Sequence, residues 1–435
     1  MVLRFHFNQG FILRLILICG LVTQCRMADL NNPSDALSDE FAKRSILSEF
    51  VRYLLREKAL PEALAVVLVK SSVPYETGLR VYKVDTESGV QDEYVSDVRT
   101  ANYAAFPGCA PYRIGVPPRS RDIITFTGSL SDRVVVHRYS SERTLALLQD
   151  QAGIGSPKIM GFSEDGKTMY QTNIVSNPNT INRWSRDSDS GVLTPNNVGS
   201  YPFAVGCSPL AIKVSEIDNL IVTINSTLVP FGINVLKKTG LDSVSLVGGA
   251  PVTLPINPSF HENLCLIESK RLLYSTSINT TTPIFGYRYD SAGNVTLLPG
   301  SPFSADSAMT AHAPNFTGTT SLSIDPTGTY AAFIYAIGST HNIRLLTIDD
   351  ATGNLIQTDQ KFTVGNGPKS LQWDRSGKFI YLISDSFGTT NNHQIEYFKL
   401  SGGILTRGEN SPIVISSMTN GYAPQDIKPI QKYYY

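Results

Sequence analysis

Short segments of alternating apolar and polar residues fill most of the chain, and many end in a tight turn marked by glycine. The alternation has a period of two, which is typical of β-strands with one buried face. A glycine turn followed by an aliphatic strand recurs at Gly89, Gly191, Gly293, Gly353 and Gly403. A fixed period of about 50 residues is typical of propellers and solenoids. The pattern therefore predicts an all-β repeat protein.

The clearest copy of the repeat predicts four antiparallel strands. Its first two strands flank a turn at Asp374 and Gly377, residues 394–400 form the third, and Gly403 leads into the fourth. Four such strands make one blade of a propeller. Counting the copies predicts a seven-bladed β-propeller with blades at 64–96, 109–150, 155–203, 207–252, 258–303, 318–364 and 366–416.

The two ends of the repeat region are complementary. Residues 64–69 correspond to the second strand of a blade, so the first blade lacks its innermost strand. Residues 423–427 follow the last blade and correspond to a first strand that opens with proline. We therefore predict that this C-terminal strand completes the first blade and closes the ring, which removes the open sheet edges.

The N-terminus has the pattern of an export signal. Arg4 and Arg14 precede the apolar stretch 15–22, which is shorter than the roughly 20 apolar residues of a membrane span. Residues 21–25, Leu-Val-Thr-Gln-Cys, resemble the lipobox of bacterial lipoprotein precursors, although Gln24 departs from the usual small residue. The resemblance implies a signal peptide at 1–24 and acylation of Cys25, which would anchor an exported protein in the cell envelope, at the outer membrane. The alternative is a soluble exported protein that is cleaved elsewhere.

Residues 25–62 are expected to form a tether and a short amphipathic helix. Apolar residues recur mostly at spacings of three and four from Leu37 to Leu55, and Pro61 ends the pattern. We expect this helix to pack on the β domain, residues 63–435. A partner-docking or membrane-surface helix is the alternative.

The charge balance and the cysteine positions limit which partners, disulfides and metal sites the sequence supports. Lys plus Arg and Asp plus Glu both number 37, so the net charge is zero and nothing favours nucleic acid as a partner. Cys109, Cys207 and Cys265 fall in the β domain and allow at most one disulfide, whose existence stays open. No Cys-x-x-Cys pair is present, so we predict neither a metal site nor a cofactor.

Residues 290–303 and 348–355 carry the repeat in its fullest form. Their Asp-x-x-Gly turns, followed by an aliphatic strand, resemble the seven-bladed propellers of the lactonase group, which includes 6-phosphogluconolactonase-type enzymes. The resemblance covers roughly residues 64–430. These motifs build turns, since glycine supplies positive φ and aspartate accepts turn hydrogen bonds, and they do not by themselves indicate an active site.

Enzymes of this group carry histidine where the innermost strands begin, at the mouth of the channel. The corresponding segments here contain no histidine and start at Cys109, Ser156, Cys207, Gly367 and Ala423.

Lys158 and Lys369 each follow the proline that opens an innermost strand, and Gln425 holds the same position in the first blade. Amine and amide donors there predict a site for a small anionic ligand. Opening a lactone needs a base and donors for the oxyanion, and His261 is a further candidate residue. We therefore expect a monomeric, lipid-anchored propeller that binds a protein or an anionic ligand without catalysis. The alternative is a lactonase-type hydrolase acting at the central channel.

Overall fold

The computed structural model describes residues 61–431, and the domain from 59 to 435 forms one compact unit. The description has gaps at 71–74, 86–88, 104–113, 128–132, 141, 153–156, 174–179, 203–208, 226–231, 240–243, 250–251, 254–262, 277–282, 310, 313–320, 386–392 and 416–421. The predicted signal peptide, Cys25 and the predicted helix all lie outside the described residues.

Seven antiparallel sheets, here called blades 1 to 7, make up the domain. Blade 1 contains β1 (Pro61–Lys70), β2 (Tyr75–Asp85), β3 (Gly89–Tyr103) and β31 (Tyr422–Gln431). Blade 2 contains β4 (Ile114–Gly115), β5 (Asp122–Thr127), β6 (Arg133–Tyr139) and β7 (Leu145–Ala152). Blade 3 contains β8 (Pro157–Phe162), β9 (Thr168–Asn173), β10 (Thr180–Arg186) and β11 (Leu193–Pro202).

The remaining four blades follow the same order. Blade 4 contains β12 (Pro209–Ser215), β13 (Leu220–Asn225), β14 (Gly232–Lys238), β15 (Val244–Leu246) and β16 (Val252–Thr253). Blade 5 contains β17 (Leu264–Ile267), β18 (Leu272–Thr276), β19 (Ile284–Tyr289) and β20 (Val295–Leu297). Blade 6 contains β21 (Ala311–His312), β22 (Leu322–Ile324), β23 (Tyr330–Ile337), β24 (Thr340–Ile348) and β25 (Leu355–Thr363). Blade 7 contains β26 (Asn366–Trp373), β27 (Phe379–Asp385), β28 (His393–Ser401), β29 (Ile404–Arg407) and β30 (Ile413–Val414).

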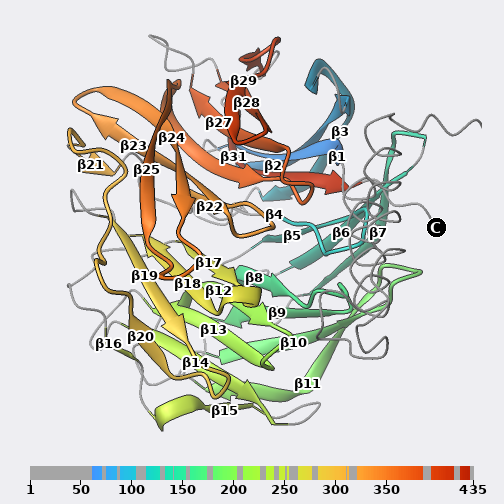
Figure 1. Cartoon of the computed structure of the whole chain (residues 1–435). Coiled ribbons are helices and arrows are strands. Elements are labelled where there is room, and N and C mark those ends of the chain that lie inside the picture. Colours follow the sequence, from blue (N-terminus) through green and yellow to red (C-terminus); the bar gives the residue numbers. More distant parts are fainter. Residues whose placement is uncertain are drawn as a thin grey trace, which may run out of the picture. The chain divides into compact units, whose positions relative to one another are not determined.

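The blades follow one another in chain order around a centre, as the colours of Figure 1 show. The labels of the inner strands β4, β8, β12, β17 and β22 gather near the middle of that view. The structure therefore confirms the predicted seven-bladed propeller arrangement.

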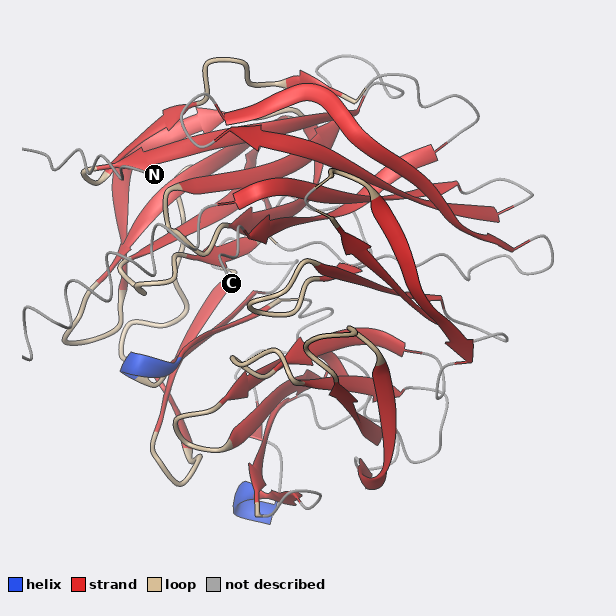
Figure 2. Ribbon diagram, turned by 90° about the vertical axis from the view of Figure 1, so that its right-hand side faces the viewer, coloured by secondary structure: helices blue, strands red, loops and turns tan. Residues whose placement is uncertain are grey.

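Almost all of the regular structure among the described residues is strand (Figure 2). The described helices are two single 3-10 turns, η1 (Val247–Gly249) and η2 (Glu268–Lys270). Neither of these described turns has the length or the hydropathy of a membrane span.

Seven apolar clusters form the core, and each lies between two neighbouring blades. Alternation along each strand sends one set of side chains to the preceding blade and the other set to the following blade. In β27, for example, Tyr381 packs toward blade 1 and Leu382 toward blade 6. Both faces of a blade are therefore buried, which explains why many strands have long runs of buried residues.

The C-terminal strand β31 pairs antiparallel with β1, from Pro61 opposite Gln431 to Lys70 opposite Tyr422. It occupies the innermost position of blade 1, where the sequence lacks a first strand. An apolar cluster that includes Leu64, Ile427 and Phe379 joins blade 1 to blade 7. The last segment of the chain thus belongs to the first blade.

The hairpin turn between the first two strands of blade 7 is organised by a buried aspartate. The Asp374 carboxylate accepts hydrogen bonds from the Ser376 hydroxyl and from the backbone amide of Phe379, the latter at 2.9 Å. Gly377 has φ 73°, a conformation that disfavours any residue with a Cβ. Burial raises the pKa of the Asp374 carboxyl to about 6, although the hydrogen bonds from Ser376 and Phe379 oppose this rise.

We expect removal of β31 to open the ring. A chain that ends at Asn420 loses the strand that pairs with β1, so the inner edge of blade 1 and its apolar residues become exposed. Limited proteolysis and size-exclusion chromatography should show a protease-sensitive or aggregating product. A truncated protein that stays monomeric with the melting temperature of the parent would show that closure does not depend on this pairing.

We expect the Asp374 carboxyl to destabilise the fold progressively as the pH rises. The folded pKa of about 6 lies above the unfolded value of 3.8, so the folded protein favours the protonated carboxyl. The resulting stabilisation is complete below pH 3.8 and is lost as the pH rises through 6. Urea unfolding at pH 4 and pH 7 should show the stability difference between wild type and Asp374→Asn falling by on the order of 1–3 kcal/mol.

Asp349→Asn is the matched control for this pH test. Hydrogen bonds from the Thr352 side chain and backbone amide lower the pKa of Asp349, so the difference between wild type and this variant should grow with pH. A stability difference for Asp374→Asn that also grows with pH would contradict the prediction.

Candidate functional site

The innermost strands surround the axis of the propeller. They are β31, β4, β8, β12, β17, β22 and β26. Innermost strands of neighbouring blades contact each other except between blades 2 and 3, where β8 contacts β5. We call the side on which they begin the start face. The opposite side, called the turn face, carries the hairpin turns that follow them, such as 163–167 and 374–378.

Two of the predicted ligand-binding residues lie on neighbouring innermost strands. Lys369 is in β26 and Gln425 is in β31, each directly after a proline, and both side chains are partly exposed. The two strands contact each other. The structure therefore places Lys369 and Gln425 on contacting strands, and a shared ligand site at these two residues stays a prediction.

The other candidates cannot be placed in the same way. Lys158 belongs to β8 in blade 3, which is not a neighbour of blade 7 or blade 1, and its side chain is not among those described. His261 lies outside the described residues.

A buried carboxylate lies directly behind this pair. Asp426 is only 2% exposed, and its Oδ1 accepts a hydrogen bond from the Ser370 hydroxyl of blade 7 at 2.7 Å. Its Oδ2 accepts one from the backbone amide of Ile114 in blade 2, at 3.1 Å. Lys428 lies 3.5 Å from Oδ1. Asp426 thereby links three blades and fixes the strands that carry Lys369 and Gln425.

Asp426 was missed by the sequence analysis, which treated the residues after each proline only as possible ligand contacts. A signal was present, because Ser370 and Asp426 hold the same position in consecutive copies, two residues after the proline. A hydroxyl and a carboxylate at such a position favour a hydrogen bond between neighbouring blades.

The start of β26 is held by a second buried carboxylate, Glu396 of β28. Its Oε1 accepts hydrogen bonds from the Gly365 amide and the Ser384 hydroxyl, both at 2.7 Å. Its Oε2 pairs with the Arg407 guanidinium at 2.5 Å. At 1% exposure and with both oxygens bonded within the protein, Glu396 holds the backbone at the start of β26 in place.

A third buried carboxylate lies between blades 5 and 6. Asp306 accepts a hydrogen bond from the Tyr335 hydroxyl at 2.9 Å and pairs with Arg344 at 3.0 Å. Burial alone would raise the pKa of Asp306, but hydrogen bonds from Ala308 and Tyr335 and the nearby arginine and lysine charges hold it below the usual value. Asp306 is therefore ionised at neutral pH, and like Glu396 it is paired within the protein.

On the turn face, an ion pair spans the ring axis. The Arg375 guanidinium of blade 7 donates to Glu164 Oε1 of blade 3 at 3.2 Å. The two blades are not neighbours, so these side chains meet only by reaching over the axis.

Neither a thiol nor a metal centre adds chemistry among the described residues. Cys265 has no disulfide partner, and burial raises the pKa of its thiol to about 11, which makes it unreactive at neutral pH. Cys109 and Cys207 lie outside the described residues. The described side chains include no group of His, Cys, Asp or Glu that could hold a metal ion.

The sequence matches no model of a known protein family and no curated protein.

Solved structures with the same fold include two lactonase-type propellers. The periplasmic gluconolactonase of Pseudomonas aeruginosa superimposes with a TM-score of 0.59 at 15% identity, over 85% of this chain and 99% of that chain. A putative 6-phosphogluconolactonase from Bacteroides uniformis gives 0.54 at 15% identity, over 70% and 83%. A hypothetical selenium-binding protein from Sulfolobus tokodaii gives 0.59 at 12% identity, over 88% and 98%. The likeness at these identities is one of fold, and it confirms that lactonase-type propellers are structural neighbours of this chain.

Proposed function

We propose that this protein is a monomeric, lipid-anchored propeller that binds a small anionic ligand at the start face without transforming it. The observation that supports the proposal best is the placement of Lys369 and Gln425 on adjacent innermost strands, fixed from behind by Asp426. An ammonium group with three donors and an amide can together hold a carboxylate or a phosphate.

The chemistry around this pair favours binding over catalysis. Hydrolysis of a lactone needs a general base within reach of the attacking water. In β26 and β31 the only carboxylate is that of Asp426, which is buried and bonded to Ser370 and Ile114, and neither strand contains histidine. The pair can thus supply donors to an anion, but it lacks a base.

The proposed location rests on the N-terminal sequence. Residues 1–24 would be removed as a signal peptide, and Cys25 would carry the acyl chains that hold the protein at the outer membrane of the cell envelope. A propeller anchored in this way would meet ligands outside the cytoplasm.

A lactonase-type hydrolase is the second candidate function. It is favoured by the structural likeness to the gluconolactonase of Pseudomonas aeruginosa, which covers almost all of that enzyme. Lys158 and His261, which lie on or near other innermost strands in the sequence pattern, would then have to supply the catalytic groups together with Lys369.

We expect the purified protein to bind 6-phosphogluconate and not to hydrolyse 6-phosphogluconolactone above the buffer rate. Lys369→Gln removes a charged donor, and a hydrogen bond to a charged group contributes roughly 1.5–3 kcal/mol, so calorimetry should show binding weakened by at least about tenfold. Lys399→Gln, on the third strand of the same blade, is the control for loss of a charge and should bind as the wild type does.

Two outcomes of this experiment would change the proposal. Lactone turnover that disappears in Lys158→Ala or His261→Ala would favour the hydrolase. Equal binding of 6-phosphogluconate by wild type and Lys369→Gln would remove the proposed site.

We expect Cys25 to be acylated. Cells that express the wild type should incorporate radiolabelled fatty acid into the protein, and Cys25→Ser should abolish the label because the thiol that carries the lipid is gone. Cys19→Ser alters the other N-terminal cysteine and should retain the label. Equal labelling of wild type and Cys25→Ser would disprove the anchor.

A further inference from the structure

A polar cavity of about 410 Å³ lies between blades 3 and 4 on the turn face. Its walls include Asp165 and Thr168 of blade 3 and Glu216 and Lys238 of blade 4. The apolar cluster between these blades has five buried residues, fewer than any of the other six described clusters. Among the described residues, this interface therefore has the fewest buried apolar side chains.

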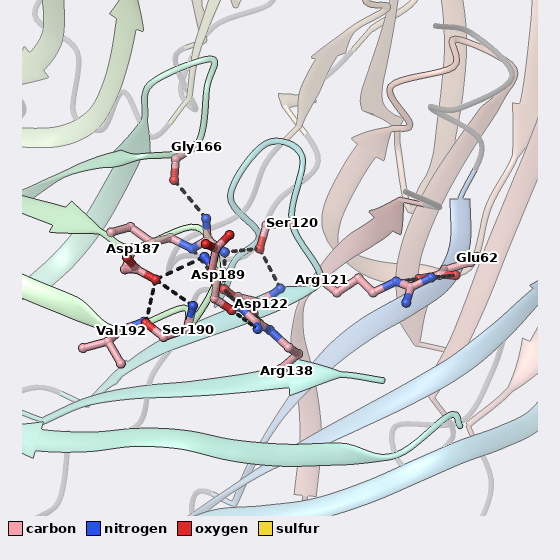
Figure 3. Close-up of polar contacts among 11 residues, drawn as sticks. Glu62, Ser120, Arg121, Asp122, Arg138, Gly166, Asp187, Asp189, Ser190 and Val192 are labelled. Atoms are coloured by element: carbon pink, nitrogen blue, oxygen red, sulfur yellow. Dashed lines mark hydrogen bonds and ion pairs between the residues drawn. The ribbon is translucent and has the colours of Figure 1, made fainter. Parts of the chain in front are cut away.

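The neighbouring interface shows what fills this space elsewhere. At the end of β10, the Arg186 side chain of blade 3 reaches across to blade 2 and pairs with the buried carboxylate of Asp122. Arg186 also donates to the Ser120 hydroxyl at 2.8 Å and to the Gly166 carbonyl at 3.3 Å. Arg138 joins the same carboxylate at 2.6 Å, as seen in the network around Asp122 in Figure 3. Cationic side chains and a carboxylate thus fill the corresponding space between blades 2 and 3.

Lys238 holds the position in blade 4 that Arg186 holds in blade 3. The backbone amide of Arg186 donates to the carbonyl of Lys167, and that of Lys238 donates to the carbonyl of Asn219, so both end the third strand of a blade at the same point. Each of these cationic side chains lies beside the preceding blade.

The carboxylate itself has no counterpart at the cavity. In blade 2, the carbonyl of Arg121 accepts a hydrogen bond from the amide of Tyr139, and the next residue is Asp122. In blade 3, the carbonyl of Lys167 accepts the equivalent bond, and the next residue is Thr168. Lys238 therefore faces a threonine where Arg186 meets an aspartate, and its ammonium bonds instead to Glu216 of its own blade, at 3.1 Å. The carboxylate is particular to blade 2, because the matching residues of blades 4 to 7 are Leu220, Leu272, Tyr330 and Phe379. At the cavity the short Thr168 side chain leaves the space beside Lys238 open.

Charges of both signs surround the cavity. Arg183 and Lys238 supply cations, and Asp165 and Glu216 supply carboxylates. Burial alone would raise the pKa of Asp165, but hydrogen bonds from the Ser163 hydroxyl and the Lys167 amide hold it below the usual value, so Asp165 is ionised at neutral pH. A balanced set of charges disfavours a ligand with a large net charge and favours one that carries both signs.

We infer that this cavity binds a small zwitterion with a carboxylate and an ammonium group, such as a free amino acid. The ligand's carboxylate takes the place that the Asp122 carboxylate occupies at the neighbouring interface and meets Lys238 and Arg183. Its ammonium group meets Asp165 and Glu216. The volume lies within the roughly 300–1,000 Å³ of small-molecule sites. The site is on the face opposite the one on which Lys369 and Gln425 lie, so it is independent of the function proposed above.

The ligand class is tested by calorimetry and thermal unfolding with the common free L-amino acids, each at millimolar concentration. At least one should bind and raise the melting temperature. Its N-acetyl derivative lacks the ammonium and its amide lacks the carboxylate, so each should bind at least about tenfold more weakly. The inference is overturned if no amino acid binds, if the derivatives bind as well as the parent, or if only an uncharged polyol such as sorbitol binds.

Variants test the location. Lys238→Gln should weaken binding of that amino acid at least about tenfold, whereas Lys237→Gln, the adjacent residue of β14, is not part of the cavity wall and should bind normally. Thr168→Asp places a carboxylate where blade 2 has Asp122. It should abolish binding with a melting temperature at or above that of the wild type, because Lys238 gains a second carboxylate partner beside Glu216.

Thr168→Asp also serves as a control for misfolding. If this variant is folded and stable but does not bind the amino acid, the loss of binding comes from the new carboxylate in the cavity and not from unfolding. Wild-type affinity in Thr168→Asp, or in a folded Lys238→Gln, overturns the location. Lys369→Gln should leave amino-acid binding unchanged, which separates this site from the one on the start face.

Discussion

The buried carboxylate of Asp426 is the contact on which the arrangement of the ring depends most directly. It comes from the last strand of the chain and bonds to Ser370 of blade 7 and to the amide of Ile114 in blade 2. Removing a carboxylate from water costs several kcal/mol unless hydrogen bonds and a cation offset the loss, and Lys428 supplies the cation. If β31 paired with β1 in another register, the Asp426 carboxylate would be buried without these partners. Asp426 therefore also specifies the correct register of β31.

Other buried carboxylates recur in the ring, and of the three below only Asp122 pairs with an arginine of another blade. Asp122, Asp306 and Glu396 each pair with an arginine and with hydroxyl, phenol or amide donors. Apolar packing between twisted sheets is largely non-directional, whereas an ion pair with several hydrogen bonds has a defined geometry. The contacts of Asp426 and Asp122 therefore orient neighbouring blades that the apolar clusters hold together. Between blades 3 and 4, Thr168 lies where blade 2 has Asp122, and the cavity lies beside it.

The two faces of the propeller offer different chemistry. The start face has a lysine and an amide on adjacent strands, backed by fixed carboxylates that are already bonded within the protein. The turn face has short hairpins, an ion pair over the axis between Arg375 and Glu164, and the mixed-charge cavity. The structural neighbours share the fold of this chain at 12–15% identity, so a function has to be argued from these side chains and cannot be carried over from the fold.

The sequence by itself determined the strand content, the repeat of about 50 residues and the number of blades. Period-two alternation and glycine turns are local features, and they recur in each copy of the repeat. It also placed Lys369 and Gln425 at equivalent positions. Only the tertiary structure decided which side chains meet across blades: Asp426 with Ser370, Arg186 with Asp122, and the gap beside Thr168. These partners are more than 50 residues apart along the chain, and whether a polar side chain faces a partner, water or a cavity depends on the neighbouring blade, which no local pattern specifies.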